Sequence, residues 1–105
     1  MKASYAITWQ EGAEPVRHGK LELRSDALVL EGSDAAGPQG RHIAYDEVTS
    51  AHVARTRNER LSGRQTLVVA RRRATSFRIT AVSQPGIISE VAENLSALRT
   101  AAGAT

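Results

Sequence analysis

Apolar and polar residues alternate from the start of the chain to about residue 81, and one helical repeat follows. In "KLELR", Leu21 and Leu23 fall on one face and the charged residues on the other, which is typical of a half-buried β-strand. The same period of two extends over residues 4–9, 20–24, 27–32, 41–45, 48–55, 66–70 and 76–80. Between residues 85 and 99 the apolar positions recur at helical spacing. The sequence therefore predicts seven strands followed by one α-helix.

The predicted connections follow from turn residues. Segments 10–18 and 32–40 contain glycine and proline and are predicted to be loops. At Asp46–Glu47 the alternation changes parity, which predicts a β-bulge. Ser83 is the expected N-cap of the helix and Pro85 lies in its expected first turn. We expect one domain over residues 1–100 and a disordered tail over 101–105.

Seven strands and a single helix can bury their apolar faces only if the sheet closes or folds on itself. The expected fold is therefore mainly β: a seven-stranded antiparallel barrel, or an orthogonal sandwich of two sheets, capped by the C-terminal α-helix. Trp9 is expected to pack in the core or at its rim. The alternation places these side chains inward: Leu21, Leu23, Leu28, Leu30, Ile43, Tyr45, Leu67, Val69, Phe77 and Ile79.

Composition excludes several kinds of chemistry. The chain has 105 residues and no cysteine, so it forms no disulfide, thiolate nucleophile or cysteine zinc site. No apolar run is long enough to span a bilayer, and the start lacks a secretory signal, so we expect a cytoplasmic protein. Twelve arginines against two lysines suggest a GC-rich bacterial genome. His42 and His52 are expected to form a surface pair on neighbouring strands, and we expect no metal or other cofactor.

Three consecutive arginines, Arg71 to Arg73, separate the last two predicted strands. If Val69 and Phe77 both point inward, the intervening loop has an odd length, and a five-residue loop from Arg71 to Thr75 is expected. Three interpretations remain open at this point. The arginines form a solvated hairpin tip, they form a site for an anion or acidic partner, or "RRAT" is a basophilic kinase target.

The segments "GKLELRSDALVLEG" at 19–32 and "IAYDEVTSAHV" at 43–53, with the hairpin at 66–81 and the helix at 85–99, resemble the pleckstrin-homology-like superfold. Its bacterial and GRAM-type members are the most similar. The resemblance implies an adaptor in which the loops after the first, third and sixth strands meet at an open rim, away from the helix. It places these basic residues at or near that rim as the candidate binding set: Arg17, Lys20, Arg41, Arg71, Arg72 and Arg73.

The functional expectation is a non-enzymatic interaction module that meets an acidic protein surface, or anionic lipid headgroups, at the open rim. No catalytic constellation is found, since the adjacent carboxylates Asp46 and Glu47 point apart on an extended chain. The net charge of +3 is modest, and none of the four aromatic residues lies within the basic run, which argues against nucleic acid. The alternative is a small barrel that binds an apolar ligand or has an unidentified enzymatic activity, and it requires a hollow core.

Overall fold

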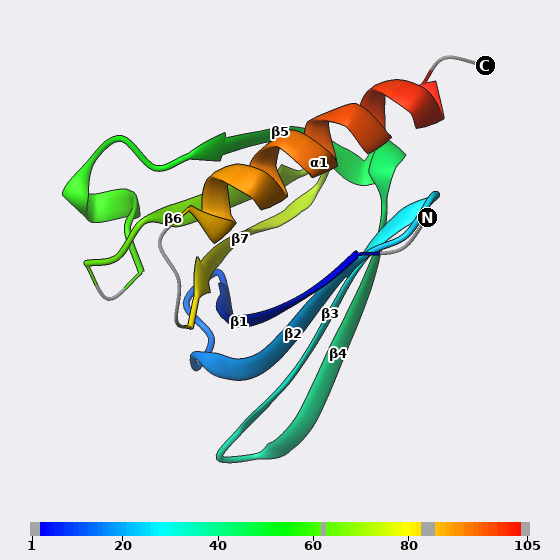
Figure 1. The fold of residues 1–105 in the computed structure, drawn as a ribbon. Coiled ribbons are helices and arrows are strands. Elements are labelled where there is room, and N and C mark those ends of the chain that lie inside the picture. The colour runs from blue at the N-terminus through cyan, green and yellow to red at the C-terminus, as the bar shows by residue number, and fades with distance from the viewer. Residues whose placement is uncertain (1–2, 62, 83–85, 104–105) are drawn as a thin grey trace.

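The computed structural model describes residues 3–61, 63–82 and 86–103. Within these residues the chain forms seven β-strands, two short 3₁₀ turns and one α-helix (Figure 1). The elements in chain order are β1 (Ala3–Glu11), β2 (Arg17–Leu23), β3 (Ala27–Asp34), β4 (Gly37–Ala44), η1 (Tyr45–Glu47), β5 (Val48–Val53), η2 (Arg57–Glu59), β6 (Thr66–Arg71), β7 (Ala74–Ala81) and α1 (Ile87–Gly103). The predicted order of seven strands and a C-terminal helix is confirmed.

The strands form one antiparallel sheet in the order β4-β3-β2-β1-β7-β6-β5. β1 joins its two halves. Residues Ala3 to Trp9 pair with β2, and residues Ile7 to Glu11 pair with β7, so the middle of β1 is paired on both sides. The sheet curls around the core into a half-barrel, and the two edge strands β4 and β5 are not paired with each other (Figure 1).

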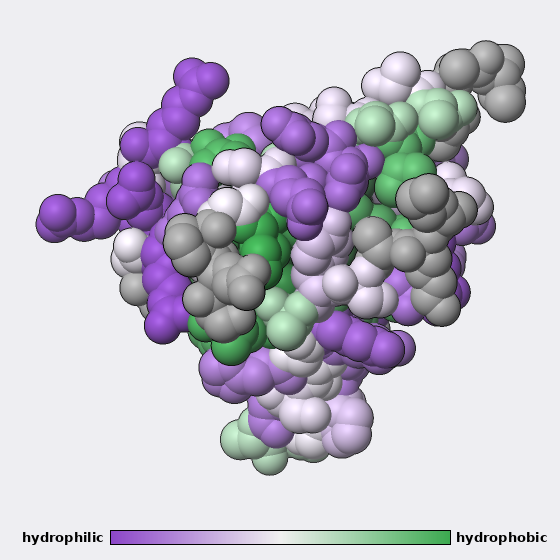
Figure 2. Space-filling model, in the orientation of Figure 1, coloured by the Kyte–Doolittle hydropathy of each residue, from purple (hydrophilic) through white to green (hydrophobic). Residues whose placement is uncertain are grey.

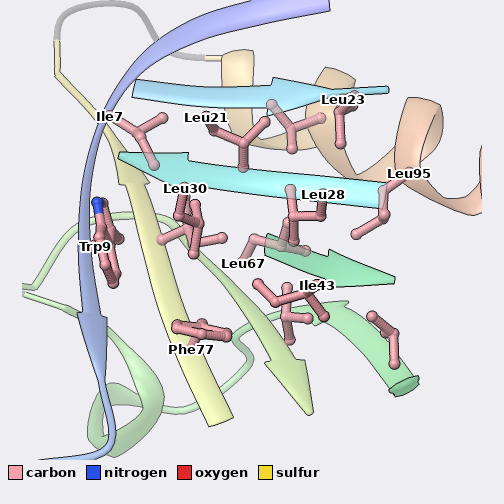
Figure 3. Close-up of a cluster of buried hydrophobic side chains, with 14 of the residues drawn as sticks. Ile7, Trp9, Leu21, Leu23, Leu28, Leu30, Ile43, Leu67, Phe77 and Leu95 are labelled. Carbon is pink, nitrogen blue, oxygen red and sulfur yellow. The ribbon is translucent and has the colours of Figure 1, made fainter. Parts of the chain in front are cut away.

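The concave face of the sheet and one face of α1 enclose a single apolar core (Figure 3). Trp9 and Phe77 are its largest fully buried side chains, and their rings meet edge to face at 5.9 Å between centroids. Ile88, Val91 and Leu95 of α1 belong to the same cluster. Every side chain that the alternation placed inward is buried, and Trp9 lies in the core as expected.

The predicted loop over 32–40 is wrong, because most of this segment is a hairpin. β3 continues to Asp34, β4 begins at Gly37, and only two residues connect them. The Asp34 carboxylate accepts a hydrogen bond from the Ala36 backbone N–H at 2.7 Å, which closes the turn. Pro38 is tolerated because β4 is an edge strand with one unpaired side. The predicted loop over 10–18 is likewise shortened to residues 12–16.

The predicted bulge lies in β5, where the register with β6 shifts between Val48 and Ser50, and a 3₁₀ turn at Tyr45–Glu47 precedes it. This turn carries the chain from one edge of the sheet to the other, so β4 and β5 do not continue a single strand. The predicted pair of His42 and His52 is therefore wrong, because β4 and β5 are not neighbours in the sheet. The His52 side chain instead lies 3.0 Å from Glu59 Oε2.

At the C-terminus, α1 continues through residues 101–103, where a disordered tail was predicted, and its 17 residues are neither long nor apolar enough to cross a membrane. Residues 104 and 105, like the predicted N-cap Ser83 and the first-turn Pro85, lie outside the described residues.

Gly19 of β2 pairs with Gly32 of β3, and neither position has room for a side chain. A Cβ atom added to Gly19 would overlap the Glu31 carbonyl oxygen, which also accepts the Trp9 indole N–H at 3.0 Å. One added to Gly32 would lie 2.8 Å from Trp9 Nε1. Glycine therefore lets β3 bend against β2 over the indole ring.

We expect Gly19→Ala to lower the free energy of unfolding by about 2 kcal/mol or more, because the crowded atom is backbone and cannot rotate away. Urea denaturation of purified variants measures this. Gly40→Ala is the matched control, since its nearest neighbour, the Leu30 carbonyl oxygen, would be 3.8 Å from the added Cβ. Equal stability of the two variants would contradict the assignment.

Candidate functional site

Glu11 is the last residue of β1 and its side chain points inward, in register with Ile7 and Trp9. Its carboxylate accepts hydrogen bonds from Arg41 Nε at 2.8 Å and from Arg71 Nη2 at 2.6 Å. Arg41 lies on the edge strand β4 and Arg71 at the end of β6. One buried carboxylate thus connects both halves of the sheet across the open end of the core.

Arg17, at the start of β2, lies beside this group with only 4% of its side chain exposed. Its Nε donates to Asp34 Oδ2 at 3.0 Å and its Nη2 to Glu14 Oε1 at 2.5 Å. Its Nη1 lies 3.9 Å from Glu11 Oε1 and makes no hydrogen bond. The guanidinium carbon is 4.9 Å from the centroid of the Trp9 ring, a cation–π contact.

These residues form what we call the rim cluster: Glu11, Glu14, Arg17, Asp34, Arg41 and Arg71. Three guanidinium groups face three carboxylates, so the formal charges cancel. Arg71 also covers the Phe77 ring, with 4.2 Å between guanidinium carbon and ring centroid. The cluster therefore stabilises the open end of the core through its own ion pairs, and its arginines already have partners.

The rim cluster lowers the pKa values of Glu11 and Asp34. Burial of Glu11 favours the neutral acid, but hydrogen bonds from Arg41 and Arg71 outweigh this effect and lower its pKa. The Asp34 pKa is lowered by its hydrogen bond from Arg17 and by the N–H of Ala36. Both carboxylates are thus held in the charged form, which does not suit them to general acid catalysis at neutral pH.

The six predicted binding residues fall into three places. Arg17, Arg41 and Arg71 lie together around Glu11 and its neighbouring acids. Lys20 lies apart from them and its ammonium is 3.5 Å from Glu31 Oε2, with both side chains about half exposed. Arg72 and Arg73 form the tip of the β6–β7 hairpin and are exposed. The sequence feature that indicates the rim cluster is Glu11, an acid at an inward-facing position. The prediction considered basic residues and did not include it.

The hairpin tip is tighter than the predicted five-residue loop. Arg71 pairs with Ala74, so the loop is Arg72–Arg73 alone, and the parity of Val69 and Phe77 is restored by an extra residue in β7. Arg73 adopts the left-handed conformation, with φ of 60°, at a position where glycine or asparagine is more usual. A five-residue loop was predicted on the assumption that both strands are regular. A bulge in β7 also keeps Val69 and Phe77 on the same face, and it allows a shorter turn.

The tip lies against the C-terminal half of α1, which corrects the expectation that it is remote from the helix. The Arg72 N–H donates to the Glu47 carbonyl at 2.8 Å. A groove of about 500 Å³ lies between the tip, η1 and α1. It is lined by the charged residues Asp46, Arg72 and Arg99, by the hydroxyl residues Ser96 and Thr100, and by Tyr45 and Val48.

The walls of this groove are held by two contacts. Arg99 Nη2 donates to the Val48 carbonyl at 3.1 Å, which fixes α1 to the start of β5. The Tyr45 hydroxyl donates to the Arg24 carbonyl at 2.5 Å, and burial, with a contribution from Asp26, raises the pKa of Tyr45 to about 12. The Arg72 and Arg73 side chains make no hydrogen bond or ion pair with any residue that the structure describes.

No family model and no curated protein matches the chain. Among solved structures, a match is the crystal structure of the C-terminal domain of an unknown protein from Leishmania infantum. The TM-score is 0.68 at 16% sequence identity, and the match covers 92% of this chain and 81% of that one. This likeness shows the fold alone.

We expect Glu11→Gln to lower the free energy of unfolding at pH 7 by about 2 kcal/mol, because Arg41 and Arg71 lose a charged acceptor in a buried setting. Urea denaturation provides the measurement. The control is Glu31→Gln, which removes the exposed pair with Lys20 and should change stability by less than about 1 kcal/mol. A loss at Glu11 no larger than the control would show that the rim cluster does not stabilise the fold.

The stability difference between the wild type and Glu11→Gln should depend on pH. Because the pKa of Glu11 is lower in the folded than in the unfolded chain, its stabilisation is fully present above the unfolded pKa and is lost as pH falls through the folded pKa. The wild-type advantage over Glu11→Gln should therefore shrink below about pH 4.3 and vanish at lower pH. Denaturation curves at several pH values between 7 and 2 test this. An advantage that stays constant over the whole range would contradict it.

Proposed function

We propose that this chain is a non-catalytic interaction module of the pleckstrin-homology-like class, built from one curled seven-stranded sheet and a C-terminal helix. The order of seven strands and a C-terminal helix, and the shared strand β1, support this class. The carboxylates of the rim cluster are paired with arginines and offer no unengaged acid or base, which supports a binding role.

The binding surface in this proposal is the tip groove, formed by the β6–β7 tip and the cavity beside α1. The observation that carries it is the contrast between the arginines of the chain's basic run: Arg71 is engaged by Glu11, while Arg72 and Arg73 are exposed next to a groove. The left-handed conformation of Arg73 at the turn is consistent with a role for its side chain, since backbone strain is concentrated at functional sites.

An acidic protein segment fits this surface better than a lipid headgroup. The groove combines two guanidinium groups with two hydroxyls, while Tyr45 and Val48, which also line it, are themselves buried. Arg is enriched in protein interfaces, whose rims combine polar and charged groups. Asp46 on the same wall would repel a surface that carries only anionic groups.

The test is a titration of ¹⁵N-labelled protein with a synthetic peptide that alternates glutamate and leucine, followed by NMR. We expect shifts at the tip groove and at least a tenfold loss of affinity in Arg72→Glu/Arg73→Glu, because each reversal puts a carboxylate where a guanidinium was. Arg55→Glu/Arg57→Glu has the same change in charge and should retain affinity. Shifts confined to other surfaces, equal loss in both variants, or binding to phosphatidylglycerol vesicles without the peptide would overturn the proposal.

A further inference from the structure

A second group of arginines lies in the loop between β5 and β6, whose described residues, 54–61 and 63–65, we call the basic loop. It contains Arg55, Arg57, Arg60 and Arg64 and one acid, Glu59. All four arginines are exposed. The loop projects at the left of Figure 1, and Figure 2 shows long hydrophilic side chains extending from that part of the surface.

The arginines of the basic loop differ from those of the rim cluster because most have no partner. Among the residues that the structure describes, the side chains of Arg55, Arg57 and Arg60 make no hydrogen bond and no ion pair. Arg64 donates to the carbonyls of Ala81 and Val82 at 3.5 and 3.4 Å. Glu59, the only acid, accepts from the Thr56 hydroxyl and the Arg55 N–H and faces His52, so it neutralises none of the guanidinium groups.

The backbone that carries these arginines is held against the sheet. The Ala54 N–H donates to the Thr66 carbonyl at 2.7 Å and the Leu61 N–H to the Thr66 hydroxyl at 2.8 Å. Leu61 is 5% exposed and Thr66 is fully buried. The guanidinium groups therefore project from an anchored loop.

The basic loop presents charge and no apolar contact surface. Its two apolar residues, Ala54 and Leu61, are both buried, and it contains no aromatic residue. An interface between the basic loop and a protein would lack the apolar centre on which interface affinity depends. Guanidinium groups alone can bind a regular array of phosphates, because each can donate two hydrogen bonds to the oxygens of one phosphate.

We propose that the basic loop binds the phosphate backbone of a nucleic-acid duplex without reading its sequence. A duplex is favoured over a single strand because the loop has no aromatic side chain on which unpaired bases could stack. The scarcity of aromatic residues, which argues against recognition of single strands, does not affect backbone contacts. The affinity belongs to the weak, salt-dependent range of non-specific binding, with a Kd of about 10⁻⁴ to 10⁻⁶ M.

Fluorescence anisotropy with a labelled 20-base-pair DNA of arbitrary sequence tests this inference. At low salt the wild type should bind, and the logarithm of its affinity should fall with the logarithm of salt concentration, with a slope of about −0.9 for each phosphate neutralised. In Arg55→Ala/Arg57→Ala/Arg60→Ala affinity should fall at least tenfold, and the slope should become shallower by about 2.7 if each arginine neutralises one phosphate. Arg64 is kept because its contacts support the fold.

The control is Lys20→Ala/Arg24→Ala/Arg78→Ala, which removes three positive charges outside the basic loop and the tip groove and should retain most of the affinity and the slope. Circular dichroism checks that both variants fold. No binding of the wild type at low salt, an equal loss in the two variants, tighter binding of single-stranded DNA, or equal competition by polyglutamate would overturn the proposal. The last result would indicate an acidic protein as the partner.

Discussion

The sheet of this protein leaves one end of its core open, and a single buried carboxylate bridges that opening. Glu11 lies at the end of β1, the strand that pairs with both halves of the sheet, and it is contacted by arginines from β4 and β6. Apolar packing explains why the sheet curls, but β4 and β5 remain unpaired with each other. The ion pairs of Glu11 link β4 to β6, two strands that are not paired with each other in the sheet.

The arginines of this chain therefore have two distinct roles. Those of the rim cluster are paired, partly buried and stacked on aromatic rings, and their positive charge is cancelled locally. Those of the hairpin tip and the basic loop are exposed, and they form no ion pair with any residue that the structure describes. The first group stabilises the fold and the second is the group available to partners. Composition alone does not separate the two groups, because every arginine adds one positive charge to the net charge of +3 wherever it lies.

Much of the fold could be predicted from alternation, because the side chains of a strand point to opposite faces whatever the tertiary structure. This is why the inward positions from Leu21 to Ile79 were correct. The errors arose where parity or turn residues allow two solutions. Glycine and proline in 32–40 indicated a loop, but they also suit the turn and edge of a long hairpin. At the β6–β7 tip, a bulge in β7 and a two-residue turn together keep Val69 and Phe77 on the inward face. The ion-pair partners of Arg17 and Arg71 could not be predicted from the basic residues alone, since the residue that brings these arginines together is the acid Glu11.

The position of Trp9 has a practical consequence. It is the only tryptophan, its side chain is fully buried, its indole donates to the Glu31 carbonyl, and Arg17 covers its ring. The same ring touches Phe77 in the centre of the core. Its intrinsic fluorescence therefore responds both to loss of the guanidinium at the rim and to entry of water into the core. The molecule carries its own optical probe at the place where the ionic and apolar parts of its structure meet.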